Sequence, residues 1–345
     1  MLTQILSFNV SSNTITEMLV LGFSGFLLSM AITPIYTHFA YSGKWWKKSR
    51  ENTVTGEKAT MFNKLHKAKL SRNIPTMAGL IFVATVTIVT LMFNLSRTET
   101  WLPLAAFVGA AGVGLIDDII NIRGVGKGVA GLPSRLKFIM ITAVASIGGW
   151  YFFAKLDVTS VNIPFIGDLA LGWLIIPLFA FVVVATANAV NITDGLDGLA
   201  GGLTAIAFGI YAIIAFLEQR YGVAGLCLTL VGALLSYTWF NVFPARFFMG
   251  DVGSFALGAV LGVIAMITDT VAVLPLIGIV FVAETGSVII QIASKKLRNG
   301  KKIFKIAPIH HHFEASGWPE TKVTMRFWIL GQVAAFTGLI VYILG

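Results

Sequence analysis

The chain has 345 residues, of which 56% are hydrophobic and 12% are charged, and its formal net charge at pH 7 is +9. Soluble domains carry about 25% charged residues, so this composition excludes an ordinary soluble protein and indicates an integral membrane protein. The one cysteine, Cys227, excludes a disulfide or a cysteine-based metal framework within the chain. The positive charge does not require a nucleic-acid partner, because membrane topology accounts for most of it.

Long apolar runs predict an all-α polytopic membrane protein with about ten transmembrane helices, forming one integral membrane domain over residues 1–345. The runs are continuous and do not alternate as in a membrane β-barrel. Residues 1–15 contain no Lys or Arg, so we expect a retained first helix rather than a signal peptide. The predicted spans are about 16–41, 75–95, 101–117, 135–154, 171–190, 199–217, 222–240, 252–269, 271–294 and 324–344.

Lysine and arginine gather on one side of this arrangement. All but three of the 25 lie in or beside the loops that follow the odd-numbered spans, and the exceptions are Arg97, Lys155 and Arg220. By the positive-inside rule, the odd-numbered loops face the cytoplasm and both termini are extracytoplasmic. The basic and aromatic segment 42–74 is typical of an interfacial anchor, with substrate binding as the alternative.

Five aspartates fall at the ends of predicted spans on the cytoplasmic side: Asp117, Asp118, Asp194, Asp197 and Asp251. An ionised carboxylate in the middle of a membrane helix costs about 2.5–3.5 kcal/mol, so we do not expect so apolar a chain to carry five without use. Asp117 and Asp118 close the third span. Adjacent helical residues point about 100° apart, so one can face a metal ion while the other contacts protein or substrate. An ordinary polar helix end is the alternative.

Polar residues recur at every third position after the fifth span, at Asn188, Asn191, Asp194 and Asp197. On a helix they would form one stripe, and Gly195 would permit a bend and the close approach of a ligand. The stretch lacks the spaced oxygen ligands and the closing glutamate of an EF-hand. We therefore interpret it as a binding segment rather than a linker.

The loop over residues 241–254 joins spans seven and eight and places Asp251 at the start of span eight. The free amides and the dipole of a helix N-terminus attract anions, including phosphate. Helix capping alone is the other interpretation of Asp251. Phe247 and Phe248 offer a face on which a base could stack, although phenylalanine at a membrane edge more often packs against protein.

Three consecutive histidines, His310, His311 and His312, lie in the last cytoplasmic loop. In an extended segment, His310 and His312 would converge while His311 faces away. Neither a cysteine nor a second histidine cluster completes a zinc site, so we expect these imidazoles to contact phosphate or sugar. Glu284 lies inside the ninth span and needs a partner or a water-filled cavity.

The acidic, basic and apolar features together favour one class of reaction. Carboxylate oxygens without thiolates favour a hard cation, most simply Mg²⁺. Mg²⁺ beside Lys, Arg and His suits phosphoryl transfer, in which positioning and charge neutralisation supply most of the catalysis. The membrane setting indicates that one reactant is a lipid.

At these residues the chain closely resembles the phospho-N-acetylmuramoyl-pentapeptide transferase family, within the polyprenyl-phosphate N-acetylhexosamine-1-phosphate transferase superfamily. The resemblance covers nearly the whole chain, and its aspartate motifs are specific to the superfamily. The His-His-His-Phe-Glu stretch points to the muramoyl-pentapeptide branch. The matching stretches are Pro75–Met77, Asp117-Asp118, Asn191–Leu199, Asn241–Gly253 and Pro308–Glu314.

The resemblance implies attack by undecaprenyl phosphate on the β-phosphate of UDP-MurNAc-pentapeptide, with release of UMP and a requirement for Mg²⁺. It also implies a homodimer in the bacterial cytoplasmic (inner) membrane, an active site on the cytoplasmic face, and a groove near the ninth span for the prenyl chain. The lipid product would be the first lipid intermediate of peptidoglycan, which links the chain to cell wall biogenesis.

The resemblance also implies roles for individual residues. Asp251 matches the metal ligand, and the catalytic set is Asp117, Asp118, Asp251 and His310. Asp117 and Asp118 match positions for a base or a lipid-phosphate contact, and Phe248 matches a position that stacks on uracil. The substrate-binding set is Thr76, Asn188, Asn191, Asp194, Asp197, Asn241, Phe248, Gln291, His311 and His312.

Two segments depart from the family pattern. Ser71–Ile74 stands where the family usually has Lys-x-Gly-Thr, and either Lys69 or Arg72 would replace the nucleotide-contacting lysine. After Asp117-Asp118 the family often has Tyr and then Lys, whereas here Ile119, Ile120 and Asn121 follow. Arg123 and Lys127 would supply the missing charge.

Alternatives remain for the mechanism and for the function. A phosphate monoester has a second pKa of about 6, so the lipid phosphate is largely dianionic and favours direct single displacement over a covalent aspartyl-phosphate. Asp117 would then orient the nucleophile or remove a residual proton. The nearest rival function is a polyprenyl-phosphate GlcNAc-1-phosphate transferase. A lipid or solute transporter is more remote, because transporters place polar sites near the bilayer midplane, often in repeated halves.

Overall fold

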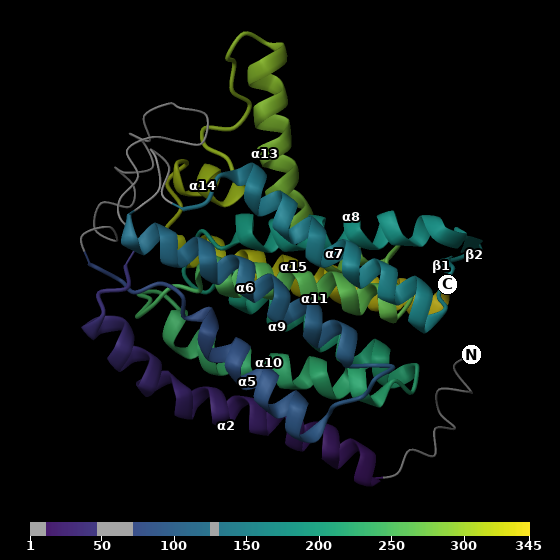
Figure 1. Ribbon diagram of the computed structural model, residues 1–345. Helices are drawn as coiled ribbons and strands as arrows, with labels where there is room; N and C mark the ends of the chain where they lie inside the picture. The colour runs from purple at the N-terminus through teal and green to yellow at the C-terminus, as the bar shows by residue number, and fades with distance from the viewer. Residues whose placement is uncertain (1–11, 47–71, 125–130) are drawn as a thin grey trace.

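The computed structural model describes residues 12–46, 72–124 and 131–345, which form a bundle of long helices (Figure 1). Lys69, Lys127 and most of segment 42–74 lie outside these described residues. Eight helices in the described ranges are long and apolar enough to cross a membrane. They are α2 (Ser12–Ser42), α6 (Trp101–Arg123), α7 (Ser134–Leu156), α8 (Ile175–Thr193), α9 (Leu199–Leu217), α10 (Tyr221–Asn241), α11 (Gly250–Ile267) and α15 (Glu320–Leu344).

The other two predicted spans form shorter or broken helices. The second corresponds to α5 (Gly79–Phe93), an apolar helix of 15 residues. The ninth is interrupted at Gly278 between α12 (Leu274–Ile277) and α13 (Ile279–Leu297). Figure 1 shows α13 leaving the bundle at a steep angle to the other helices. The count of ten spans and the orientation of the termini remain predictions.

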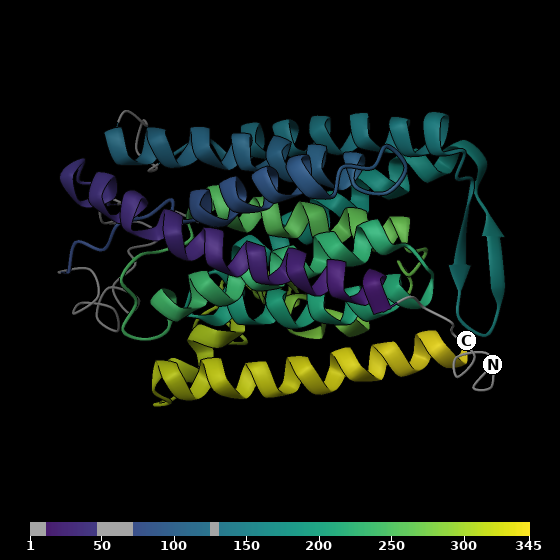
Figure 2. The ribbon, with the colours of Figure 1, turned by 90° about the horizontal axis from the view of Figure 1, so that it is seen from below.

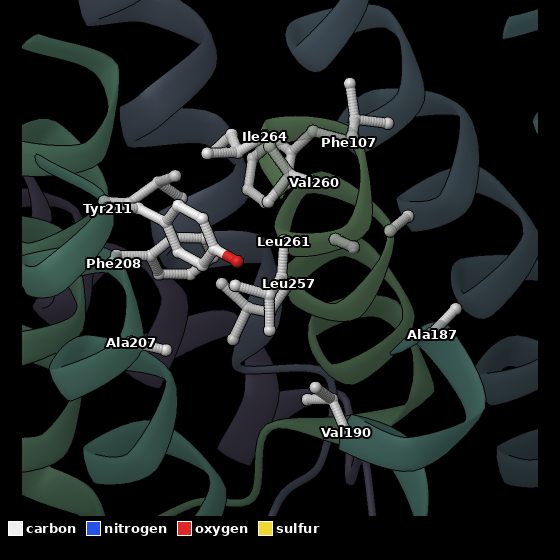
Figure 3. Packing of buried hydrophobic residues seen from close by; sticks show 14 of the residues in the cluster. Phe107, Ala187, Val190, Ala207, Phe208, Tyr211, Leu257, Val260, Leu261 and Ile264 are labelled. Carbon is white, nitrogen blue, oxygen red and sulfur yellow. The ribbon is translucent and has the colours of Figure 1, made fainter. Parts of the chain in front are cut away.

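Helix α11 forms the centre of the bundle. Nearly every residue from Gly250 to Ile267 is buried, and the helix packs against α5, α6, α8 and α9. Figure 3 shows Leu257 and Leu261 of α11 among side chains of the neighbouring helices, including Phe208 of α9. A helix that is apolar on all sides is stable only when neighbours surround it, which explains this central position. The core therefore fixes the position of the Asp251 end of α11.

A short β-hairpin departs from the predicted all-α fold. Strand β1 (Ser160–Ile163) pairs antiparallel with β2 (Gly167–Ala170), and Ser160 lies opposite Ala170. A four-residue strand is too short for its alternating pattern to stand out in the sequence. Gly172–Leu174 then form a 3-10 turn that leads into α8. Figure 2 shows the hairpin at the end of the bundle that also carries the start of α2 and the end of α15.

Glu218 follows α9 at this same end of the bundle. Its carboxyl group accepts hydrogen bonds of 3.1 Å from the Tyr342 hydroxyl and 3.1 Å from Nε of Arg220. Burial raises the pKa of Glu218 from 4.5 to about 7, although these two partners oppose the shift. Folded Glu218 thus keeps its proton to a higher pH than unfolded Glu218. Its contribution to stability is full below pH 4.5 and is lost as the pH rises through about 7.

The variant Glu218→Gln should therefore lose less stability than the wild-type protein when the pH is raised from about 5 to about 8. Glutamine keeps the shape of the side chain but has no proton to lose. Thermal unfolding in detergent at a series of pH values measures the difference. Parallel curves of Tm against pH for the two proteins would contradict the expectation.

Candidate active site

The candidate site lies at the end of the bundle opposite the hairpin. Figure 1 places the short helix α14 (Ile309–Glu314) at this end. Asp117 and Asp118 lie inside α6, which continues to Arg123 and ends at Gly124 in a left-handed conformation. The helix thus runs six residues beyond the predicted end of the third span at about residue 117. The apolar residues after Asp118 continue the helix for more than one further turn, and Gly124 supplies the end.

Asp117, Asp251 and Lys137 meet at the centre of the site. The ammonium nitrogen of Lys137, in the first turns of α7, lies 3.3 Å from Oδ2 of Asp117 and 3.2 Å from Oδ2 of Asp251. The Asp117 side chain is 1% exposed, that of Asp251 14% and that of Lys137 20%. The other oxygen of Asp117 accepts a hydrogen bond from the backbone N–H of Leu132. Three helices thus place two carboxylates around one positive charge.

Asp118 has a different set of contacts from its neighbour. It is fully buried, and its Oδ2 accepts a 3.0 Å hydrogen bond from the backbone N–H of Val252, in the first turn of α11. A carboxylate satisfies the free amides at a helix N-terminus and is favoured by the helix dipole. Asp118 therefore holds the start of α11 against α6, while Asp117 faces Asp251.

The segment that carries Asp194 and Asp197 is helical only in part. Helix α8 ends at Thr193, so Asn188 and Asn191 lie on the helix, Asp194 caps it and Asp197 lies in the following turn. The prediction that all four residues form one stripe on a helix was therefore wrong beyond Thr193, where the helix ends. The side-chain amide of Asn188 donates to the carbonyl of Val184 at 2.8 Å on its own helix. The amide of Asn191 donates to Oγ of Ser254 on α11 at 2.8 Å.

Buried polar contacts tie this turn to the loop before α11. Oδ2 of Asp197 accepts a 3.0 Å hydrogen bond from the backbone N–H of Ala245. Oδ1 of Asn241 accepts from the N–H of Gly198 at 3.0 Å, and its Nδ2 donates to the carbonyl of Phe247 at 2.8 Å. Asn241 and Asp197 thus fix the two loops against each other.

The two adjacent phenylalanines have different surroundings. Phe247 is fully buried against Tyr36, Tyr237 and Phe240, so it belongs to the core. Phe248 is half-buried, and its backbone N–H donates to the carbonyl of Pro75 at 2.8 Å. The loop with Phe248 therefore runs beside the segment that contains Thr76.

Thr76 lies beside the loop of Phe248 and Asn121 lies in the last turn of α6, and both side chains are buried and polar. Oγ1 of Thr76 and both amide atoms of Asn121 have no hydrogen-bond partner among the described residues. Each residue is 1% exposed. Arg72 is exposed at the start of its described segment. Buried polar groups without partners are costly, so Thr76 and Asn121 are suited to bind polar groups of a ligand.

The three histidines lie on a helix rather than in an extended segment. On α14, His310 and His311 are the buried pair, with ring centroids 4.1 Å apart. The prediction that His310 and His312 converge in an extended segment was therefore wrong. Nδ1 of His310 lies 2.8 Å from Oε2 of Glu284 on α13, and Nδ1 of His311 lies 2.6 Å from Oε2 of Glu314.

His312 and Gln291 hold the chain that precedes α14. Nδ1 of His312 accepts a 3.1 Å hydrogen bond from the backbone N–H of Lys305. Oε1 of Gln291, on α13, accepts from the N–H groups of Ile303 and Phe304, each at 3.0 Å. Nε2 of Gln291 donates to the carbonyl of Phe304 at 2.9 Å. Both side chains thus bind backbone in this structure.

Sequence reasoning missed Lys137. Its only signal in the sequence was a lysine at the cytoplasmic end of a predicted span, which the topology rule already explained. The need of Glu284 for a partner was recognised, and His310 is that partner. Each contact joins residues that are distant in the sequence, so local patterns give no indication of it.

The donor set fits a hard divalent cation. Among the described residues, no group of three or more His, Cys, Asp or Glu side chains is arranged as a metal site. Mg²⁺, however, is usually held by one or two carboxylates together with substrate phosphates and water. Asp117 and Asp251 supply two carboxylates around one position of positive charge, now taken by the ammonium group of Lys137.

Comparisons with known proteins show which family the chain resembles. Residues 100–269 match the family described as glycosyl transferase family 4. A phospho-N-acetylmuramoyl-pentapeptide-transferase of Chloroflexus aggregans is 37% identical over 334 residues, covering 93% of this chain and 88% of the relative. A protein of the same name from Clostridium perfringens is 42% identical over 288 residues, covering 79% of this chain and 90% of the relative.

A third relative of this name, from Thermodesulfovibrio yellowstonii, is 40% identical over 287 residues, covering 77% of this chain and 79% of the relative. Identity at this level over most of both chains implies a shared fold. With its apolar helices and its gathered aspartates, the chain belongs to the phospho-N-acetylmuramoyl-pentapeptide-transferase family.

Proposed function

We propose that the chain transfers phospho-MurNAc-pentapeptide from UDP-MurNAc-pentapeptide to undecaprenyl phosphate, which releases UMP and forms the first lipid intermediate of peptidoglycan. The observation that carries the proposal is the meeting of Asp117 and Asp251 around Lys137 at one end of an apolar bundle. The names of the relatives support the choice of donor. The basic loops on the side of the site support a cytoplasmic active site in the bacterial inner membrane.

Mg²⁺ is the proposed cofactor, and Asp251 and Asp117 would hold it. When bound, the ion would neutralise charge on the diphosphate of the donor. The ammonium group of Lys137 contacts both of these carboxylates, so its positive charge would lie beside the bound ion. Two carboxylates supply only part of the coordination that Mg²⁺ requires, which leaves room for phosphate oxygens of the substrate.

The proposed reaction is a single displacement. An oxygen of the lipid phosphate forms a bond to the β-phosphorus, and the bond from that phosphorus to the bridging oxygen breaks, so that UMP leaves with the electron pair. Asp117 would orient the attacking phosphate or accept its residual proton. Thr76 and Asn121, buried without partners among the described residues, would bind polar groups of the substrates.

The remaining assignments concern the nucleotide and the assembly. Phe248 is half-buried beside the Thr76 segment, a position from which its ring could stack on uracil. Asn241 and Asp197 would shape this subsite through their contacts with both loops. The proposed assembly is a homodimer in the lipid bilayer, with the prenyl chain lying along α13, whose exposed side chains include Ile289 and Ile292.

The test is an assay of UMP release by purified protein in detergent. UDP-MurNAc-pentapeptide and undecaprenyl phosphate with Mg²⁺ should give UMP and a lipid-linked muramoyl product, and omission of Mg²⁺ should stop the reaction. UDP-GlcNAc in place of the muramoyl donor separates the proposal from the rival N-acetylglucosamine-phosphate transferase. If UMP is released from UDP-GlcNAc but not from UDP-MurNAc-pentapeptide, the proposed donor is wrong.

Gly114 provides a test of the geometry that the proposal requires. It lies one turn before Asp117, and a Cβ atom at Gly114 would collide with the backbone carbonyl of Asp251. Gly114→Ala should push the start of α11 away from α6 and lower kcat about 10²-fold, because displacement of a catalytic group by about 1 Å has effects of this size. UMP release at saturating substrate concentrations measures the loss.

The matched control is Gly112→Ala on the same helix. A Cβ atom at Gly112 has no neighbouring atom within 4 Å, so this variant should keep wild-type turnover. Both substitutions change helix propensity in the same way, so a difference between them reports on packing. Equal turnover in the two variants would show that the close contact between α6 and α11 is not needed for activity.

A further inference from the structure

Glu284 and His310 form a fully buried pair that the proposed reaction leaves unexplained. Nδ1 of His310 and Oε2 of Glu284 lie 2.8 Å apart, and both side chains are 0% exposed. A carboxylate buried in a membrane protein is costly to keep, so a functional role is the default expectation.

The imidazole ring of His310 points from Glu284 toward the turn that carries Asp194. The ring nitrogen on the far side, Nε2, faces Gly195, where any Cβ atom would collide with it. Glycine at this position therefore lets the ring approach the turn closely. Gly195 lies between two residues of the proposed substrate site, Asp194 and Asp197. The pair thus joins α13 to the substrate side of the site through one imidazole.

The chemistry of the pair determines what Nε2 can do. A carboxylate at Nδ1 favours the tautomer in which Nδ1 carries hydrogen, and it stabilises the imidazolium that forms when Nε2 also takes a proton. Nε2 can then donate a hydrogen bond to an anionic oxygen. The other titratable groups around the ring are His311, in ring contact on α14 and itself bound to Glu314, and Asp194, which precedes Gly195.

We propose that Glu284 is a positioning residue for the transfer reaction, which orients His310 and stabilises its protonated form so that Nε2 donates to a phosphate oxygen of the UDP-linked donor. The inference rests on the proposed function and adds a buried carboxylate–imidazole pair to it. Glu284 contacts no substrate and acts only through His310. The loss of its charge therefore affects the reaction through the protonation of one imidazole.

The experiment compares Glu284→Gln with wild-type protein across pH. Glutamine can still accept a hydrogen bond from Nδ1 but carries no charge. The variant should lower kcat about 10–100-fold, the usual effect of losing an outer partner of a functional histidine, with a smaller change in KM for the donor. The alkaline limb of kcat/KM should move to lower pH by about one unit, because the imidazolium has lost its counter-charge.

A double-mutant cycle shows whether Glu284 acts through the histidine. In the background of His310→Asn, the Glu284→Gln change should cost less than about 2-fold, because its route to the substrate is gone. The matched control is Glu218→Gln, a half-buried glutamate at the opposite end of the bundle, which should leave turnover and the pH limb unchanged. Equal costs in the two backgrounds, or an unmoved pH limb, would overturn the proposal.

Folding is checked by thermal unfolding of each variant in detergent. If Glu284→Gln does not fold, Glu284→Asp replaces it. Aspartate keeps the charge but places its carboxylate oxygens farther from His310. In this variant kcat should fall while the alkaline limb of kcat/KM stays in place. All ratios are measured with whichever UDP-sugar the wild-type protein consumes. Failure of the muramoyl donor would therefore reject the proposed function without deciding the role of Glu284. An unmoved limb in Glu284→Gln, or a limb moved by about one unit in Glu284→Asp, would reject that role alone.

Discussion

Asp251→Asn is expected to lower Mg²⁺-dependent UMP release at least about 10³-fold, while the protein still folds and enters the membrane. Asp251 lies in the first turn of α11, and its carboxylate shares Lys137 with Asp117. Asparagine has nearly the same shape but no charge, so the site would lose one of the two carboxylates proposed to hold the ion. Electrostatic groups aimed at reacting phosphates commonly contribute effects of this size.

The measurement is initial UMP release over a range of Mg²⁺ concentrations, with thermal unfolding as a check of the fold. Asp168→Asn is the matched control, because Asp168 is an exposed aspartate on β2, at the far end of the bundle. That variant should have wild-type activity and a wild-type dependence on Mg²⁺. Turnover of Asp251→Asn within a few-fold of wild type would exclude Asp251 as the metal ligand.

The helices could be predicted because an apolar run long enough to span a bilayer gives a strong local signal. Helix α9 has the predicted bounds, and α11 begins within two residues of the predicted start. The errors fall where local signals are weak. The hairpin strands are too short for periodicity, and α6 continues past Asp118 to Arg123, where Gly124 ends it.

The gathering of the aspartates could be predicted from the free-energy cost of carboxylates inside a membrane and from the predicted topology. Their hydrogen-bond and ion-pair partners could not be predicted in this way. The Val252 amide binds Asp118 and Lys137 binds Asp117, and each pair is separated by 15 or more residues of sequence. The helical arrangement of the histidines could have been predicted, since Pro308 directly precedes α14 and proline is favoured at helix starts. The extended interpretation overlooked that signal, and so it paired His310 with the wrong neighbour.

Lys137→Met is expected to lower kcat about 10²-fold and to make the protein more dependent on Mg²⁺ for its stability. The ammonium group lies 3.3 Å and 3.2 Å from two carboxylates, one of them 1% exposed. Unit charges about 4 Å apart near a protein surface interact by about 4 kcal/mol, so removal of the lysine leaves the two carboxylates in strong repulsion. Methionine keeps the apolar part of the side chain and removes only the charge.

Two measurements separate this role from a purely structural one. Mg²⁺ should raise the Tm of Lys137→Met by more than it raises the Tm of wild type, because the ion binds carboxylates that the ammonium no longer neutralises. The Mg²⁺ concentration for half-maximal turnover should fall for the same reason. Lys155→Met, which changes an exposed lysine in the last turn of the same helix, should match wild type in both. An equal Mg²⁺ shift in Tm for Lys137→Met and wild type would mean that the ion and the ammonium group do not share these carboxylates.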